Sequence, residues 1–103
     1  MATSQEFIEY VYDSIKHFGF TRYKKMFGEY MIYVDEKPIL LICDNTVFVK
    51  IVPQTIELMV TSGKGFPYNG AKEHYVLDVE DFQLLEQLIP LLIQITPLPK
   101  KKI

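Results

Sequence analysis

The sequence of 103 residues lacks the features of several protein classes. It has one cysteine, Cys43, so no internal disulfide can form and the fold depends on its core. It has no apolar run of about 18 residues, the length that spans a membrane, and no N-terminal signal-peptide pattern. Eleven Lys and Arg against thirteen Asp and Glu give a formal charge of −2, which disfavours a strongly basic nucleic-acid binder. We therefore expect a soluble, cytoplasmic protein without a membrane segment.

Familiar catalytic and metal-binding motifs are also absent. The sequence contains no glycine-rich phosphate loop, no serine nucleophile elbow and no His-Glu-x-x-His zinc motif. The possible nitrogen and sulfur ligands, His17, His74 and Cys43, are scattered along the chain. Cys43 ends an apolar run, and we interpret it as a buried small hydrophobe rather than a nucleophile. We expect no enzymatic activity, no metal and no cofactor.

The apolar content that is present favours one compact core. Hydrophobic residues make up 49% of the chain and aromatic residues 14%, and folding a chain of this size buries about two thirds of its surface. We expect a single domain over residues 1–99 and a basic tail over residues 100–103. Without the three tail lysines, eight basic and thirteen acidic residues leave the domain at −5.

The first half of the chain predicts a helix followed by a β-meander. Thr3 and Glu6 fit a capping box, and apolar residues then recur at helical spacing as far as Phe18, before Gly19 as a left-handed cap. Polar turns at 35–37 and 44–45 separate the later strands. The runs rich in β-branched and aromatic residues are Thr21 to Phe27, Glu29 to Val34, Ile39 to Cys43 and Thr46 to Ile51.

The second half predicts a helix, a long loop, a strand and a last helix. Pro53 can open the second helix and Gly63 can end it. The strand is expected from His74 to Leu77, and Asp78 can cap the last helix. The order α-β-β-β-β-α-β-α predicts a two-layer α+β domain with helices on one face of an antiparallel sheet.

The last helix has an unusually wide apolar side. Its apolar residues fill an arc of roughly 200° at about 100° per residue, and Pro90 on the polar side is expected to bend it. Either two layers of the fold cover this arc, or a partner does. Leu84, Leu88 and Leu91 are the candidate contacts for a partner.

A basic cluster occupies the first predicted strand. Alternation places Arg22, Lys24 and Met26 on one face and Thr21, Tyr23, Lys25 and Phe27 on the other. Mixed basic and aromatic residues on a sheet can bind single-stranded nucleic acid. Alternatively, the lysines protect an edge strand against aggregation.

Four blocks of the sequence are similar to a known family. They are Thr3-Ser-Gln-Glu-Phe7, Arg22-Tyr-Lys-Lys-Met-Phe-Gly-Glu-Tyr30, Leu41-Ile-Cys-Asp-Asn45 with Val47-Phe-Val-Lys50, and Phe66-Pro-Tyr-Asn-Gly-Ala-Lys72. In this order and spacing they resemble the TfoX N-terminal domain family. The resemblance implies an α+β fold akin to the type III secretion chaperones and a relation to TfoX (Sxy), a bacterial regulator of competence. That regulator has a second, C-terminal domain, so we expect a stand-alone family member.

The blocks of this resemblance also contain the remaining candidate site residues. Gly28, between Phe27 and Glu29, suits a bulge or reversal between two strands, and Tyr30 follows it. Lys24 or Lys25 could pair with Glu29. Tyr68, Gly70 and Lys72 lie in a predicted loop, which either binds a ligand or is merely shaped by Pro67 and Gly70.

Three functions remain open from the sequence. The favoured one is a small regulatory or protein-interaction module, which the apolar last helix, the apolar third strand and the family resemblance support. We expect it to form a homodimer or to bind another protein. The alternatives are a nucleic-acid-binding accessory factor and a small-ligand-binding protein that uses the loop over residues 63–75.

Overall fold

The fold is an α+β domain with one helix before the sheet and two helices after its meander. The computed structural model describes residues 3–26 and 29–99. The helical elements are α1 (Gln5–Ile15), the short 3-10 helix η1 (Lys16–Phe18), α2 (Pro53–Leu58) and α3 (Phe82–Ile95). The strands are β1 (Thr21–Met26), β2 (Glu29–Val34), β3 (Lys37–Cys43), β4 (Thr46–Lys50), β5 (Lys64–Gly65) and β6 (His74–Val76). The predicted order is confirmed, except that the short strand β5 was expected to be loop.

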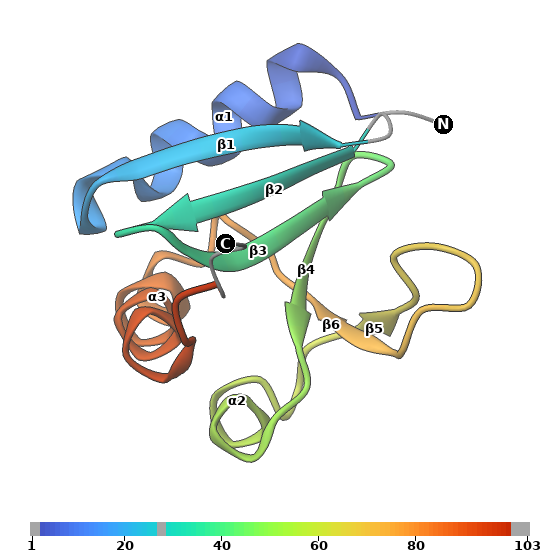
Figure 1. Cartoon of the computed structure of the whole chain (residues 1–103). Coiled ribbons are helices and arrows are strands. Elements are labelled where there is room, and N and C mark those ends of the chain that lie inside the picture. Colours follow the sequence, from blue (N-terminus) through green and yellow to red (C-terminus); the bar gives the residue numbers. More distant parts are fainter. Residues whose placement is uncertain (1–2, 27–28, 100–103) are drawn as a thin grey trace.

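The six strands form one antiparallel sheet in the order β1-β2-β3-β4-β6-β5 (Figure 1). Two tight turns connect β2 to β3 and β3 to β4. Their residues Asp35, Glu36, Asp44 and Asn45 all have φ between 51° and 67°, the left-handed conformation of two-residue hairpin turns. The turns predicted from the sequence are therefore confirmed.

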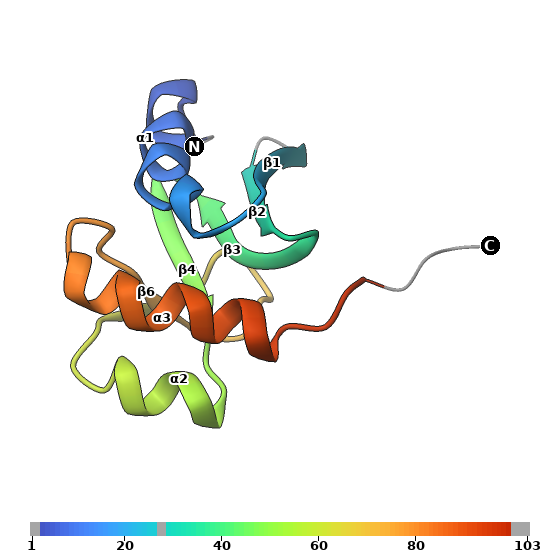
Figure 2. The same ribbon diagram turned by 90° about the vertical axis from the view of Figure 1, so that its left-hand side faces the viewer.

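All three helices lie on the same side of the sheet, as Figure 2 shows. The core lies between the two layers and takes alternate side chains from each strand. On β2, the inward residues Tyr30, Ile32 and Val34 are buried and the residues between them are half-buried. The main core residues from the helices are Ile8, Val11, Ile15, Leu85, Leu88, Ile89 and Leu92.

The start of α1 differs from the prediction. Ser4 is the N-cap residue, and its Oγ accepts a hydrogen bond from the Phe7 N–H at 3.1 Å. Thr3 does not form the predicted capping box with Glu6. Its hydroxyl instead donates a hydrogen bond to Oε1 of Glu29 at 3.0 Å. Thr3 precedes the helix and lies beside Glu29, the first residue of β2.

The start of α3 also differs from the prediction. Asp81, not Asp78, is the N-cap residue and accepts a hydrogen bond from the Leu84 N–H at 3.2 Å. Asp78 instead accepts from the Glu80 N–H at 2.9 Å, in the turn before the helix. Pro90 lies inside α3 and is exposed, on the solvent side where the sequence placed it.

The predicted glycine ends of the first two helices are wrong. Gly19 has φ 166°, which is extended and not left-handed. A side chain is excluded there by space, because a Cβ would lie 2.9 Å from Cγ1 of Val34. The second helix ends at Leu58, well before Gly63.

Candidate interaction surface

The face of the sheet opposite the helices carries a continuous row of apolar side chains. Strand register places Met31 opposite Leu41, Leu41 opposite Phe48, and Phe48 opposite Val76. We call these four residues, from β2, β3, β4 and β6, the apolar row. Because alternate residues of a strand point to opposite faces, the row points away from the core.

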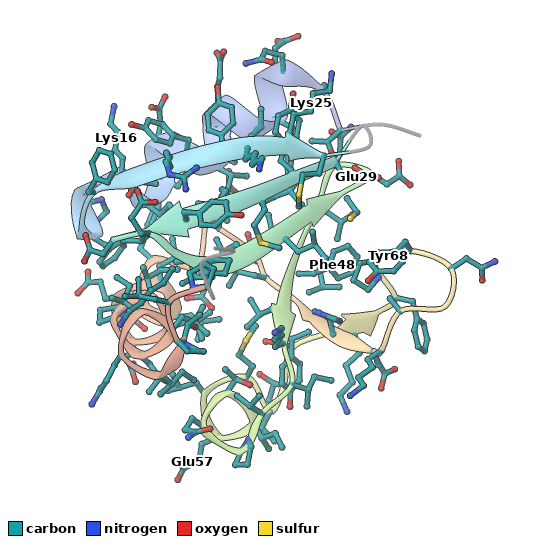
Figure 3. The ribbon with its side chains drawn as sticks, in the orientation of Figure 1. Lys16, Lys25, Glu29, Phe48, Glu57 and Tyr68 are labelled. Carbon is teal, nitrogen blue, oxygen red and sulfur yellow. The ribbon has the colours of Figure 1, made fainter. Side chains whose placement is uncertain are left out.

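The apolar row departs from the usual pattern of a two-layer domain. An antiparallel sheet with one packed face normally has polar residues on its other face. Here Met31, Leu41 and Val76 are half-buried, and Phe48 is 6% exposed. No helix of the described chain lies on this side, which faces the viewer in Figure 3. The row therefore offers the half-buried side chains of Met31, Leu41 and Val76 on a side without a described helix, while Phe48 between them is already buried.

One corner of this face holds an ion pair. The Arg22 guanidinium donates two hydrogen bonds to Glu36, from Nη2 to Oε2 at 2.8 Å and from Nε to Oε1 at 3.1 Å. Its Cζ also lies 4.3 Å from the ring centroid of Tyr33. The hydrogen bonds raise the pKa of Arg22 and lower the pKa of Glu36. Arg22 is thus held by its own chain, although the sequence offered it as a free contact residue.

The lysines around the apolar row have no such partner. Lys24 lies directly opposite Met31 and extends the row onto β1. Lys50 shares the face of Phe48 on β4 and lies opposite His74. Lys25 points to the helix side of β1, as predicted (Figure 3). All three lysines are exposed, and no carboxylate of the described residues lies within ion-pair distance of them.

Glu29 is used within the fold instead of pairing with a lysine. Its Oε1 accepts hydrogen bonds from the Thr3 hydroxyl at 3.0 Å and from the Asp44 N–H at 3.2 Å. The predicted pair with Lys24 or Lys25 is therefore not formed. Beside it, Cys43 is 1% exposed, and burial, followed by the charges of Glu29 and Asp44, raises the pKa of its thiol to about 11. The interpretation of Cys43 as a buried hydrophobe is confirmed.

Tyr30, another residue of the family-like block, is not accessible. Tyr30 lies in the core, where its hydroxyl donates to Oε1 of Gln5 at 3.3 Å. It is therefore closed to a partner. Phe27 and Gly28, with the bulge predicted there, lie outside the described residues.

The wide apolar side of α3 is covered within the fold. Leu88 is fully buried, and Leu84 and Leu91 are half-buried. The helix packs against β3 and α2, which lie on different sides of it (Figure 2). Of the two alternatives that the sequence left open, the structure supports the cover from two layers. Leu88 is accordingly not available to a partner.

The second group of predicted site residues lies together in the β5–β6 loop. Tyr68 is 61% exposed, Gly70 has φ 90°, and Lys72 is exposed. Tyr68 and Gly70, with Phe66, line an open hollow of about 520 Å³, whereas Lys72 does not line it and Pro67 of the same loop is buried. Because β5 and β1 are the two edge strands, this group lies at the opposite edge from Arg22, Lys24 and Lys25. The two groups therefore do not form one site.

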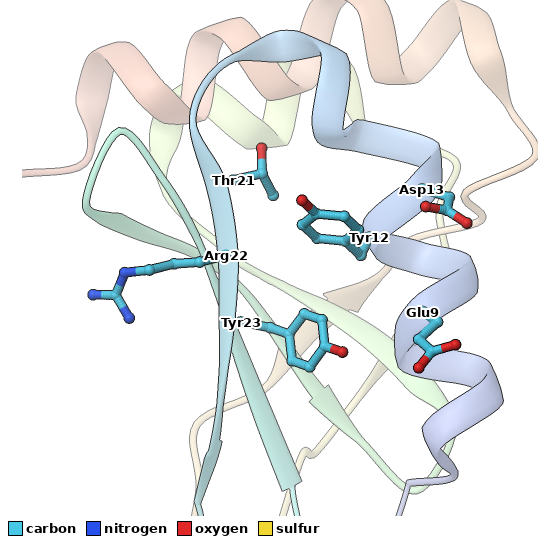
Figure 4. Close-up of a pocket in the computed structure, with 6 residues that line it drawn as sticks. All are labelled: Glu9, Tyr12, Asp13, Thr21, Arg22 and Tyr23. Atoms are coloured by element: carbon cyan, nitrogen blue, oxygen red, sulfur yellow. The ribbon is translucent and has the colours of Figure 1, made fainter.

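A groove of about 530 Å³ between α1 and β1 was not predicted (Figure 4). Its floor is formed by Tyr12 and Tyr23, whose rings meet edge to face with centroids 5.7 Å apart. Its two carboxylates already have partners: Glu9 accepts from Gln5 at 2.8 Å, and Asp13 pairs with Lys16 at 3.1 Å. Among the described residues that line it, the groove thus offers a ligand no carboxylate that lacks a partner.

The sequence reasoning missed the apolar row as a surface. The apolar character of the third strand is evident from the sequence, but the face to which each of its residues points is not. The available signal was that apolar residues occupy both alternating sets of β2 and β3. Such strands are typical of a sheet covered on both faces.

Comparisons with known proteins place the chain in a family. The model of the TfoX N-terminal domain matches residues 13–91. The chain belongs to the TfoX N-terminal domain family. It is also similar to an uncharacterized 12.7 kDa protein in the trpE 5' region of Spirochaeta aurantia, with 34% identity over 104 residues. That alignment covers 99% of this chain and 90% of the relative.

The described residues also lack membrane-spanning helices and metal-binding clusters. No helix there is long and apolar enough to cross a membrane. In the same residues, no group of three or more His, Cys, Asp or Glu side chains is arranged to hold a metal ion.

Proposed function

We propose that this member of the TfoX N-terminal domain family is a small regulatory module that binds a protein partner on its apolar row. The observation that carries the proposal is the row itself, which crosses four strands on the face without helices. Protein interfaces commonly have an apolar centre and a polar rim. The row, with Lys24 beside Met31 and Lys50 two residues from Phe48 on the same face, has this arrangement.

The nature of the row favours a binding role over a purely structural one. Solvent-facing strands usually carry polar residues, and apolar side chains gathered on such a face are typical of an interaction site. Methionine also adapts its shape to a partner. Burial raises the pKa of the Cys43 thiol to about 11, which disfavours a role for this residue as a nucleophile.

Nucleic-acid binding has less support. Arg22 is held by Glu36, and residues 1–99 have a net charge of −5. Phosphate binding depends on an excess of free basic groups.

A photo-crosslinking amino acid placed at Leu41 tests the proposal in cells of the native host. We expect a discrete adduct from position 41, and its loss when Met31→Glu is added, because Met31 lies opposite Leu41. The same crosslinker at Gln87, an exposed residue of α3, is the matched control and is expected to give no such adduct. Equal adducts from both positions, or none from position 41, would overturn the proposal.

A further inference from the structure

We infer that the segment bound by the apolar row is itself apolar and flanked by carboxylates. This inference rests on the proposed function and specifies the chemistry of the partner. It is carried by two exposed lysines on the same face of the sheet, Lys24 on β1, which extends the row, and Lys50 on β4, two residues from Phe48. Among the described residues, neither lysine has a carboxylate within ion-pair distance.

The acidic residues of the chain are placed away from this face. Eight of the thirteen are on the helices or in the turn before α3, on the other side of the sheet. They are Glu6, Glu9, Asp13, Glu57, Asp78, Glu80, Asp81 and Glu86. Of the other five, Glu36 is paired with Arg22, Glu29 accepts from Thr3 and from the Asp44 N–H, and Asp35 accepts from the Phe20 N–H. The last two are Asp44 and Glu73, and neither forms an ion pair with Lys24 or Lys50 among the described residues. The two lysines are therefore left for an external acid.

The same reasoning disfavours a second copy of the chain stacked face to face. Such a copy would bring its own Lys24 and Lys50 to the interface. The carboxylates of its Glu29 and Glu36 are already used within their own chain, so its like-charged lysines would face those of the first copy. A partner segment with Asp or Glu beside its apolar residues is complementary to both the apolar row and the two lysines.

The size of the row sets the length of the segment. Four strands at about 4.8 Å spacing place Met31 and Val76 about 14 Å apart, and Lys24 adds one more spacing. A 12-residue helix is about 18 Å long at 1.5 Å per residue, and an extended segment of the same length is longer. A 12-residue peptide therefore spans the row in either conformation.

Phage display of random 12-residue peptides on the purified protein tests the inference. Clones that also bind the Leu41→Glu variant are removed, and Met31→Gln serves as a second variant if Leu41→Glu does not fold. We expect the remaining peptides to be enriched in large apolar residues flanked by Asp and Glu. Enrichment of apolar residues without acids, or with Lys and Arg, would overturn the inference and leave the proposed function standing. A selection that yields no clones dependent on the row would overturn both.

A charge reversal then measures the role of the two lysines. We expect Lys24→Glu with Lys50→Glu to weaken the binding of a fluorescent selected peptide about tenfold. Lys25→Glu, next to Lys24 but on the opposite face of β1, is the matched control and is expected to change binding less than about twofold. Equal effects of both variants, or none from the double variant, would contradict a specific contact with carboxylates.

The crosslinking experiment separates the two partner types. An adduct of a different protein, with an acidic and apolar segment at the crosslinked site, supports the inference. An adduct at twice the 12.1 kDa mass of the chain would support the proposed function but overturn the inference.

Discussion

Leu41 and Ile42 are consecutive residues of β3 that point to opposite faces of the same sheet. Ile42 is fully buried under the helices, whereas Leu41 is half-buried in the apolar row. Both are large and apolar, so residue type alone does not distinguish them. The difference indicates that packing against the helices decides which face of the sheet contributes more to the free energy of unfolding. On the other side, the described part of the fold leaves Met31, Leu41 and Val76 half-buried.

The largest expected effect separates these two neighbours. Ile42→Ala should lower the free energy of unfolding by about 3 kcal/mol, because it leaves a cavity in a packed core. Leu41→Ala should cost about 1 kcal/mol or less, since the side chain is already partly in water. Urea unfolding of the two variants measures the difference. Equal losses would show that the apolar row is a second core rather than a binding surface.

A smaller effect concerns the ion pair at the corner of the uncovered face. The guanidinium of Arg22 lowers the pKa of Glu36 below its ordinary value of 4.5. A carboxylate with a lowered pKa stabilises the fold above its unfolded pKa, and that contribution is lost as the pH falls through the folded pKa. We expect Glu36→Gln to be less stable than the wild type at pH 7, by a margin that shrinks toward pH 3.

Urea unfolding at the two pH values checks this expectation. Glu57→Gln, which removes an exposed carboxylate from α2, is the control and should show no such margin. A margin for Glu36→Gln that persists unchanged at pH 3 would mean that the residue acts through packing and not through its charge.

Much of the fold could be predicted from local signals. Helical periodicity located α1 and α3, and the polar dipeptides located the hairpin turns because few residues adopt a left-handed φ. The helix caps could not be predicted as reliably. Thr3 and Asp78 are suitable caps by residue type. In the structure, however, Thr3 donates a hydrogen bond to Glu29, and Asp78 accepts one from the Glu80 N–H. The choice between Thr3 and Ser4 depended on a residue far away in the sequence.

The candidate site was harder to predict than the fold. The helical arc around Leu88 was a sound apolar signal, but only the third dimension showed that α2 and the sheet cover it. Arg22 was a sound basic signal, but its partner Glu36 lies across a hairpin. The apolar row was not recognised because its members come from four strands. Their alignment follows from register, which depends on the turns and on the bulge between Ile32 and Tyr33 of β2.

The most direct test uses two methionines of one molecule as reporters, one in the apolar row and one in the core. Met31 lies in the apolar row, and Met59 is fully buried in the core. Oxidation by hydrogen peroxide, followed by mass spectrometry, gives a rate for each residue with and without a saturating selected peptide. In the free protein we expect Met31 to react faster than Met59, and with the peptide bound we expect Met31 alone to be protected. An unchanged rate for Met31 while the peptide is bound would contradict the account, because the partner would then lie elsewhere.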